Sequence, residues 1–392
     1  MKVIVDENIP FAAEAFGTLG EVRALAGRAL TAAAVREAEA LIVRSVTRVG
    51  PALLDGSQVR FVGTATIGFD HVDVEYLRRR GIGFASAPGS NANSVAEYVV
   101  AALLVMAKRR GWQLAGRTLG VVGVGNVGSR VAAKARALGM NVVENDPPLA
   151  RKSGDPRFRP IEELFDADTL TLHVPLTREG PDKTHHLVDE RFVARMRRRA
   201  VLVNTSRGSV AKTSALLGAL KTGHLGALVL DVWENEPNIS TDLLERVDVG
   251  TPHIAGYSFD GKVAGTVMVY EAACRFFGHE ACWRADSVMP APAVPIVQLD
   301  AAGRRDEEVV HEAVRAVYDI EADDARLRAL LKLAASERGA EFDRLRKGYP
   351  VRREFFNTEI RLLNGSERLV RMLQGIGFRA QAVEPTQSQR MR

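Results

Sequence analysis

Cysteine is scarce in this sequence of 392 residues, since only Cys274 and Cys282 are present. Two cysteines cannot build the disulfide network of a small secreted protein, so we expect a reducing, cytoplasmic compartment. No unbroken apolar run approaches the roughly 18 residues that a membrane-spanning helix needs. The first residues, MKVIVDENIP, also lack the basic start and long apolar stretch of a secretory signal. We therefore expect no membrane association.

A strong charge of one sign is also missing, because 53 Lys and Arg residues face 48 Asp and Glu residues. An excess of +5 does not by itself indicate nucleic-acid binding. The five arginines of RFVARMRRR (191–199) do not alternate with aromatic residues suited to base stacking, so a solvated helix end is the better interpretation. His173, His185 and His186 have no cysteines or carboxylates at ligand spacing. Neither a nucleic-acid partner nor a metal is predicted.

Short β-branched runs alternate with Ala-rich stretches in the first 90 residues, which predicts an α/β fold with a parallel sheet. A long apolar helix is expected over residues 93–110, with Ser94 and Glu97 at the spacing of an N-terminal capping box. Strands are expected within KVIVDEN (2–8), EVRAL (21–25), ALIVRS (40–45), VRFVGTAT (59–66) and IGFASAP (82–88).

A second α/β series follows this helix, and its six candidate strands fit one doubly wound nucleotide-binding unit. The Pro-rich stretch MPAPAVPIVQL (289–299) then predicts a linker before a third, mostly helical region. The expected domains are a discontinuous substrate domain (1–93 plus 255–288), a nucleotide-binding domain (94–254) and a C-terminal domain (289–392).

The segment LGVVGVGNVGSR places Gly123, Gly125 and Gly128 in the G-x-G-x-x-G spacing between an expected strand and an expected helix. Glycines at these positions allow a tight turn, close approach to a pyrophosphate, and close packing of helix against strand. Asp146 comes 18 residues after Gly128, where a carboxylate accepts hydrogen bonds from ribose hydroxyls. A carboxylate there repels the 2′-phosphate of NADP, so NAD is the predicted cofactor.

Three polar residues follow expected strand ends: Arg207 in VNTSRGSV, Glu236 in DVWENEP and His253 in TPHIAGYS. Ligands of open α/β sheets bind beyond the carboxyl ends of the strands, so these loops can converge on one site. His253 would take the hydroxyl proton while hydride leaves carbon, and Glu236 would orient the imidazole. Arg207 would bind the substrate carboxylate.

At these residues the chain resembles the D-isomer-specific 2-hydroxyacid dehydrogenase family, through NTSRG, DVWENEP and TPHIAG in that order after the glycine motif. The resemblance implies a Rossmann-type NAD domain, a flavodoxin-like discontinuous substrate domain and a C-terminal α+β dimerisation domain. It also implies that Arg207, Glu236 and His253 are catalytic.

The resemblance further implies contacts with cofactor and substrate. Beside the three glycines, the implied NAD contacts are Asn126, Val127, Asp146, Val174, Thr205, Ser206, Asp231 and Gly256. Val174 stands where the family often has a hydroxyl, so only its backbone would contribute. The implied substrate contacts are Ser45, Thr66 and Tyr257. Arg44 is a candidate for the substrate phosphate, with an arginine of another subunit as the alternative.

The segments VRSVT, GTATIGFDHVD and HIAGYSFDGK resemble most the family member that oxidises 4-phosphoerythronate in pyridoxal phosphate biosynthesis. The tail resembles the dimerisation domain of that member and implies a homodimer, and a 2-oxo acid is a possible acceptor for recycling bound NADH. One alternative is oxidation of 3-phosphoglycerate or another D-2-hydroxy acid. An alternative of another class is an NAD-sensing corepressor that binds peptide motifs.

Overall fold

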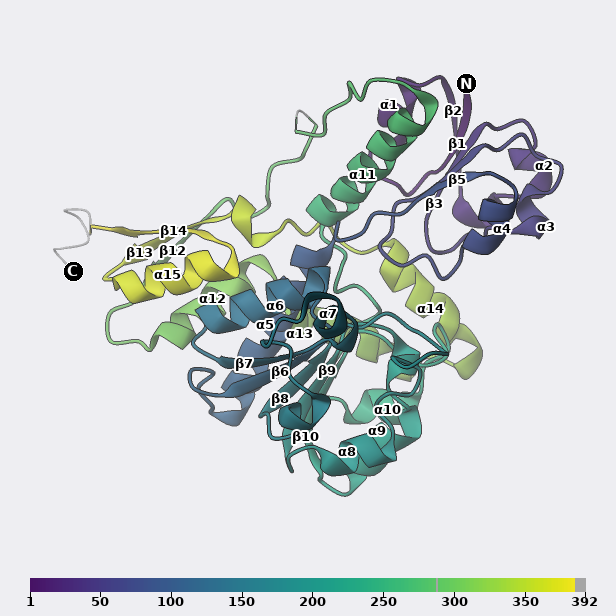
Figure 1. Cartoon of the computed structure of the whole chain (residues 1–392). Coiled ribbons are helices and arrows are strands. Elements are labelled where there is room, and N and C mark those ends of the chain that lie inside the picture. The colour runs from purple at the N-terminus through teal and green to yellow at the C-terminus, as the bar shows by residue number, and fades with distance from the viewer. Residues whose placement is uncertain (287, 385–392) are drawn as a thin grey trace. The chain divides into compact units, whose positions relative to one another are not determined.

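The computed structural model describes residues 1–286 and 288–384, and the chain divides into two compact units (Figure 1). Unit 1 contains Met1–Asn91 and Ser258–Ala291, and unit 2 contains Ala92–Tyr257 and Pro292–Arg392. The three predicted domains with their boundaries stay predictions. No helix in the part of the chain that the structure describes combines the length and apolar character needed to cross a bilayer.

Unit 1 is built on a five-stranded parallel sheet with the order β2-β1-β3-β4-β5. This is the flavodoxin-like order, and it confirms the predicted fold of this part. The strands are β1 (Lys2–Asp6), β2 (Glu21–Leu25), β3 (Ala40–Val43), β4 (Phe61–Thr64) and β5 (Gly83–Ala85). The helices are α1 (Ala12–Gly17), α2 (Ala32–Val35), α3 (Pro51–Leu54), α4 (Val74–Arg79) and α11 (Phe259–Phe277).

The central strands β1, β3 and β4 are buried on both faces, which explains their apolar runs, whereas the edge strand β2 is largely exposed. Side chains alternate along β1, so Val3 and Val5 join the cluster that contains Val269 and Tyr270 of α11. Ile4 joins the cluster on the opposite face, beside Leu77 of α4.

Unit 2 contains a six-stranded parallel sheet with the order β11-β10-β9-β8-β6-β7. An isolated bridge from Glu144 to Phe158 extends the sheet beyond β7 and completes the order typical of dinucleotide-binding domains. The six predicted strands and the Rossmann-type architecture are confirmed. The strands are β6 (Thr118–Val122), β7 (Asn141–Asn145), β8 (Thr169–Leu172), β9 (Ala200–Asn204), β10 (Leu225–Leu230) and β11 (Val249–Gly250). The helices are α5 (Ala92–Arg110), α6 (Asn126–Ala137), α7 (Pro147–Ser153), α8 (Glu190–Arg195), α9 (Thr213–Lys221) and α10 (Thr241–Arg246).

The predicted long helix is α5, but its predicted capping box is wrong. The helix begins at Ala92, which places Ser94 and Glu97 inside it. The Ser94 hydroxyl donates to the carbonyl of Ala255 at 2.8 Å, and Glu97 Oε1 accepts the N–H of Phe355 at 2.9 Å. Tertiary partners therefore engage both side chains.

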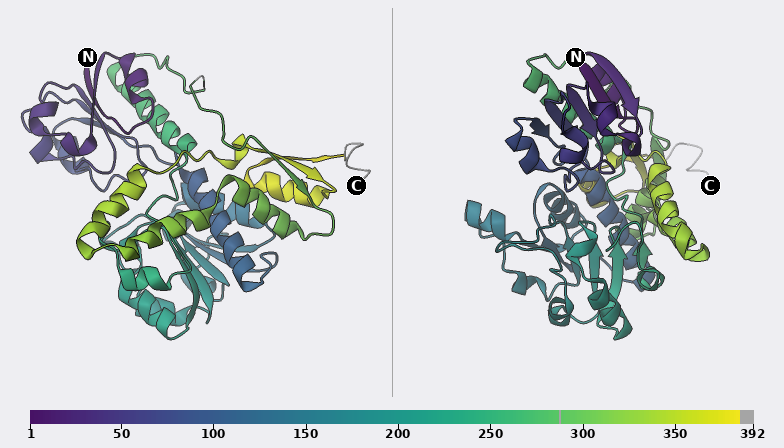
Figure 2. Two further views of the ribbon diagram at one scale, coloured as in Figure 1. Left: turned by 180° about the vertical axis from the view of Figure 1, so that it is seen from behind. Right: turned by 90° about the vertical axis from the view of Figure 1, so that its right-hand side faces the viewer.

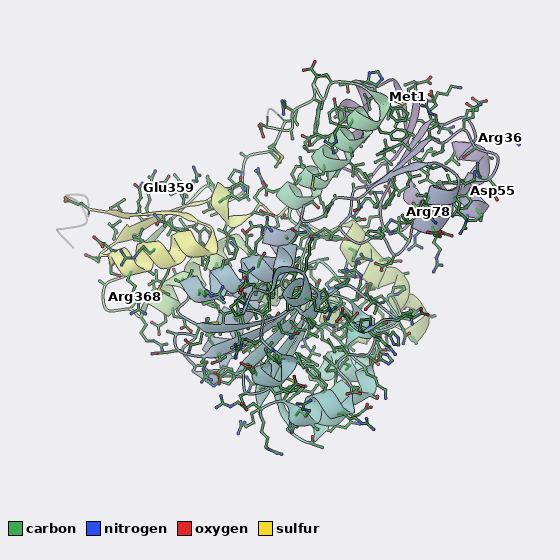
Figure 3. All side chains as sticks on the ribbon, in the orientation of Figure 1. Met1, Arg36, Asp55, Arg78, Glu359 and Arg368 are labelled. Carbon is green, nitrogen blue, oxygen red and sulfur yellow. The ribbon has the colours of Figure 1, made fainter. Side chains whose placement is uncertain are left out.

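The C-terminal part of unit 2 has its own small parallel sheet, β12-β13-β14 (Figure 2). Figure 3 labels Glu359 on this sheet and Arg368 on α15. The predicted linker is too long, because Ile296–Leu299 belong to β12 rather than to irregular chain. The elements are β12 (Ile296–Asp300), α12 (Asp306–Val317), α13 (Ile320–Arg328), α14 (Ala335–Lys347), β13 (Glu359–Leu363), α15 (Glu367–Ile376) and β14 (Arg379–Val383).

Candidate active site

The loop from β6 to α6 uses its three glycines in three ways. Gly123 has φ +85°, and a Cβ there would lie 2.7 Å from the carbonyl oxygen of His173. A Cβ on Gly128 would lie 1.9 Å from the carbonyl oxygen of Gly123, so the helix can approach the strand only without it. A Cβ on Gly125 would meet nothing within 4 Å, and α6 begins at the next residue. Open space at a helix N-terminus fits a dinucleotide pyrophosphate.

Asp146 stands at the end of β7 and faces this loop. Its Oδ2 accepts the N–H of Val124 at 2.8 Å, and its Oδ1 accepts the N–H of Leu149 at 3.0 Å at the start of α7. An ionised carboxylate has about four acceptor positions, so these two bonds leave capacity for ribose hydroxyls. The predicted ribose contact itself stays a prediction.

Other predicted cofactor residues lie at the start of α6 and in neighbouring loops of unit 2. Asn126 and Val127 open α6, and a Val174 methyl group lies 2.9 Å from the Cβ position of Gly123. Thr205 and Ser206 follow β9, and the buried Ser206 hydroxyl donates to Asn204 Oδ1 at 2.7 Å. These positions gather around the carboxyl ends of the strands, as ligand sites of such sheets do.

His173 was considered in the sequence only as a metal ligand, and the structure places it beside the predicted cofactor residue Thr205. Its Nδ1 lies 3.2 Å from the Thr205 hydroxyl, and its Nε2 lies 2.9 Å from the Thr171 hydroxyl. Desolvation lowers the pKa of His173 to about 3, so the imidazole is neutral at physiological pH. Its place at the end of β8, on the same sheet edge as the glycine loop, was the available signal.

Asp231 holds the loop that carries His253. Its buried carboxylate accepts the Thr251 hydroxyl at 2.7 Å and the N–H groups of Ile254 and Ala255 at 2.7 and 3.0 Å. These bonds flank His253, whose φ of +57° lies in a region that residues other than glycine rarely adopt. The Asp231 carboxylate therefore shapes this turn, and its predicted cofactor contact, like that of Gly256, stays a prediction.

His253 and Glu236 form a direct pair. The distance from His253 Nδ1 to Glu236 Oε2 is 2.7 Å, and Glu236 Oε1 accepts the N–H of Trp233 at 2.8 Å. Burial raises the pKa of Glu236, but the nearby imidazole and the Trp233 N–H outweigh it, so the net pKa is lowered. An ionised Glu236 can only accept, so Nδ1 of His253 carries the proton and Nε2 is left as a base.

Arg207 lies in the loop after β9, where its Nη1 donates to the carbonyl of Ser206 at 2.8 Å. The next residue, Gly208, brings this loop against the one that carries Glu236. A Cβ on Gly208 would lie 1.9 Å from the Trp233 carbonyl oxygen and 2.5 Å from the Glu234 nitrogen. The Arg207 loop and the Glu236 loop are therefore in backbone contact.

Three predicted substrate residues belong to unit 1. Arg44 and Ser45 follow β3 and Thr66 follows β4, so all three stand at the carboxyl edge of one sheet. The Thr66 hydroxyl donates to the Gly68 carbonyl at 2.9 Å, and Arg44 Nη1 lies 3.5 Å from the Asn8 carbonyl oxygen. Their contacts with substrate stay predictions.

Tyr257, the fourth predicted substrate residue, belongs to unit 2 and contacts the C-terminal part of that unit (292–384), here called the C-terminal segment. Its ring lies edge-on to Tyr349 with centroids 5.9 Å apart, and Arg346 Cζ is 5.8 Å from its centroid. Sequence reasoning missed Arg346, because nothing in the tail distinguishes it from the other exposed-looking arginines of its helix.

Comparison with known proteins matches residues 92–255 to the D-isomer specific 2-hydroxyacid dehydrogenase NAD binding domain and residues 288–377 to a domain of unknown function, DUF3410. The chain is 52% identical over 366 residues to the erythronate-4-phosphate dehydrogenase of Salinibacter ruber. The aligned region covers 90% of this chain and 92% of that relative. The corresponding protein of Cronobacter sakazakii is 46% identical over 381 residues, covering 97% and 98%.

The chain belongs to the erythronate-4-phosphate dehydrogenase family. This membership confirms the resemblance drawn from the motifs, and the match to an NAD-binding domain confirms the predicted cofactor. Among solved structures, the D-lactate dehydrogenase of Aquifex aeolicus, complexed with NAD and lactic acid, has a TM-score of 0.59 and 26% identity. That similarity covers 71% of this erythronate-4-phosphate dehydrogenase homologue and 96% of the solved chain.

Proposed function

We propose that this protein oxidises 4-phospho-D-erythronate with NAD to (R)-3-hydroxy-2-oxo-4-phosphooxybutanoate, a step in pyridoxal and pyridoxine 5′-phosphate biosynthesis. The observation that carries the proposal is the 2.7 Å pair between His253 Nδ1 and Glu236 Oε2. An imidazole oriented by an ionised carboxylate is a suitable base for an alcohol proton. The near full-length identity to erythronate-4-phosphate dehydrogenases supports the choice of substrate.

In the proposed reaction, His253 Nε2 removes the proton of the C2 hydroxyl. Glu236 fixes the tautomer and stabilises the imidazolium that forms, because its carboxylate stays ionised. NAD, when bound, accepts the hydride that leaves C2. The residues of the glycine loop, Asp146 and the Thr205 loop would hold NAD beside this dyad.

Arg207 would bind the carboxylate of the substrate and polarise the oxygen that becomes a carbonyl. A guanidinium has five donors in a planar fork, which suits an α-hydroxy carboxylate. The backbone contact of Gly208 with Trp233 supports this role, since it brings the Arg207 loop against the Glu236 loop. Arg207 and His253 would then act on adjacent groups of one substrate.

The direct test is an assay of the purified protein with NAD and each of two phosphorylated acids, 4-phosphoerythronate and 3-phosphoglycerate. A 2-oxo acid is added to recycle any NADH that stays bound. We expect 4-phosphoerythronate to be oxidised with the higher kcat/KM. Rapid oxidation of 3-phosphoglycerate with negligible turnover of 4-phosphoerythronate would contradict the proposal.

The assembly proposed is a homodimer formed through the C-terminal segment, in a cytoplasmic enzyme. Val351 and Phe356 of this segment are apolar side chains that are 63% and 49% exposed, and a subunit contact would remove them from water. Light scattering should give a mass twice that of one chain. A monomeric mass that does not change with concentration would contradict this assembly.

A further inference from the structure

Arg346, near the end of α14, reaches the candidate active site from the C-terminal segment of the same chain. The guanidinium of Arg346 lies over the Tyr257 ring, and a hydrogen bond joins the side chains of Arg346 and Tyr257. The charge of Arg346 also acts on the Glu236 carboxylate, which in turn pairs with His253. Arg346 therefore belongs to the surroundings of the dyad, although more than 90 residues separate them in sequence.

The helix that carries Arg346 is fixed against the dyad loop by close packing. A Cβ on Gly339 would lie 2.6 Å from Asn238 Oδ1 and 3.5 Å from the ring of Pro237, the residue after Glu236. One turn further, the fully buried Phe342 joins the apolar cluster that contains Trp233 and Leu244. A guanidinium on this helix is thus held in place, which favours binding of a small anion over a mobile surface contact.

The guanidinium of Arg346 is only partly engaged by the described residues. Its Nε is buried and has no hydrogen-bond partner among them. A buried N–H without an acceptor is unfavourable, so the site is suited to a ligand that supplies one. Nε and one Nη form the edge of the fork that binds two oxygens of a phosphate or carboxylate together.

We propose that Arg346, together with the Tyr257 hydroxyl, binds the phosphate group of the substrate. The proposal rests on the proposed function, in which the substrate carries an anion at each end. Arg207 serves the carboxylate next to the reacting carbon, so the second arginine serves the other end. This assignment makes the C-terminal segment part of the substrate site of its own chain and replaces Arg44 as the principal phosphate ligand.

The test compares Arg346→Ala with Arg344→Ala in the protein loaded with NADH, which cannot accept hydride from the substrate. Arg344 lies on the same helix, is exposed and pairs with Glu341, so its loss controls for changes to α14. Titration calorimetry measures binding of 4-phosphoerythronate and of erythronate, which lacks the phosphate. We expect Arg346→Ala to weaken binding of the phosphorylated acid about 30-fold or more while binding of erythronate changes less than about threefold. Arg344→Ala should change neither.

Equal weakening of both ligands, or no weakening by Arg346→Ala, would overturn the assignment. If Arg346→Ala does not fold, Arg346→Lys decides, since it keeps the charge and loses the fork. An intermediate loss of affinity that is specific to the phosphorylated ligand supports the proposal, and wild-type affinity overturns it.

Should the wild-type protein fail to oxidise 4-phosphoerythronate, the same variants are titrated with inorganic phosphate. Loss of phosphate binding in Arg346→Ala alone then supports the anion site while the substrate is reassigned.

Discussion

At the scale of single residues, the proposed reaction depends on the pair of His253 and Glu236. Replacing His253 with Ala removes the base, so we expect kcat to fall about 100-fold to 10,000-fold while NAD still binds. NADH formation measures the first quantity, and quenching of Trp fluorescence on titration with NAD measures the second.

His186 offers a matched control for this substitution, because its Nε2 lies 2.7 Å from Glu234 Oε1 in a second imidazole–carboxylate pair. His186→Ala should retain turnover. Full activity of His253→Ala would remove the proposed mechanism, because another group would then have to act as the base.

Glu236→Gln tests the orienting carboxylate separately from the base. The amide keeps an oxygen near Nδ1 but carries no charge, so it no longer stabilises the imidazolium. We expect kcat to fall about 100-fold or more with little change in KM. Steady-state kinetics with Glu234→Gln as the control measures this. An unchanged kcat in Glu236→Gln would show that the 2.7 Å contact has no part in catalysis.

Residues whose roles depend on their place next to a strand end could be predicted from the sequence. Residues whose roles depend on packing between distant segments could not. The spacing of Gly123, Gly125 and Gly128 predicts a turn, and their surroundings explain each glycine. Arg346 could not be predicted, because its meaning depends on the packing of α14 against the Pro237 loop. That packing joins segments about 100 residues apart and leaves no periodic signal in either.

At the scale of elements, the contact between the Arg207 loop and the Glu236 loop depends on Gly208. Gly208→Ala would place a Cβ within 1.9 Å of the Trp233 carbonyl oxygen, so the two backbones must separate. We expect a loss of about 1–3 kcal/mol in the free energy of unfolding and a higher KM for the substrate. Chemical denaturation and steady-state kinetics measure these changes.

Gly218→Ala is the matched control for Gly208→Ala. A Cβ on Gly218, within α9, would meet nothing within 4 Å, so alanine there should be neutral or stabilising by up to about 1 kcal/mol. Equal stability of the two variants would show that the loop contact is not tight.

The strands were the most predictable elements and the helix termini the least. Runs such as ALIV (40–43) and AVLVN (200–204) are buried on both faces of a parallel sheet, so composition alone indicates them. The capping box at Ser94 and Glu97 had the right spacing and was wrong, because the helix begins at Ala92 and both side chains bond to tertiary partners, Ala255 and Phe355. Local patterns cannot reveal such competition.

At the scale of the whole molecule, the C-terminal segment is joined to the NAD-binding part by a buried charged cluster. Glu97 of α5 accepts the Phe355 N–H at 2.9 Å, and Lys134 of α6 donates to the Ile376 carbonyl. Burial, followed by repulsion from Glu354, raises the pKa of Glu97 to about 8, against the opposing charges of Lys134 and Arg352. The fold therefore favours the protonated, neutral form of Glu97.

The raised pKa of Glu97 predicts a pH dependence of stability with a definite sign. Between about pH 5 and pH 8 the folded state holds a proton that the unfolded chain releases, so the free energy of unfolding decreases as pH rises. Above pH 8 this contribution levels off. Glu97→Gln removes this titrating group. The melting temperature of the variant minus that of wild type should therefore increase as pH goes from about 5 to about 8.

Scanning calorimetry at several pH values measures this shift, with Glu367→Gln as a control on the exposed face of α15. A constant difference in melting temperature between Glu97→Gln and wild type would mean that Glu97 is ionised in the folded protein.

The most direct test of the proposed reaction follows the hydrogen that is transferred. 4-Phosphoerythronate labelled with deuterium at C2 is incubated with the protein and NAD, and the NADH formed is analysed by mass spectrometry. Transfer of hydride from C2 predicts one deuterium in the NADH that the wild-type protein forms. His253→Ala should form NADH at least about 100 times more slowly. NADH without deuterium, or no NADH from the wild-type protein, would contradict the proposed reaction.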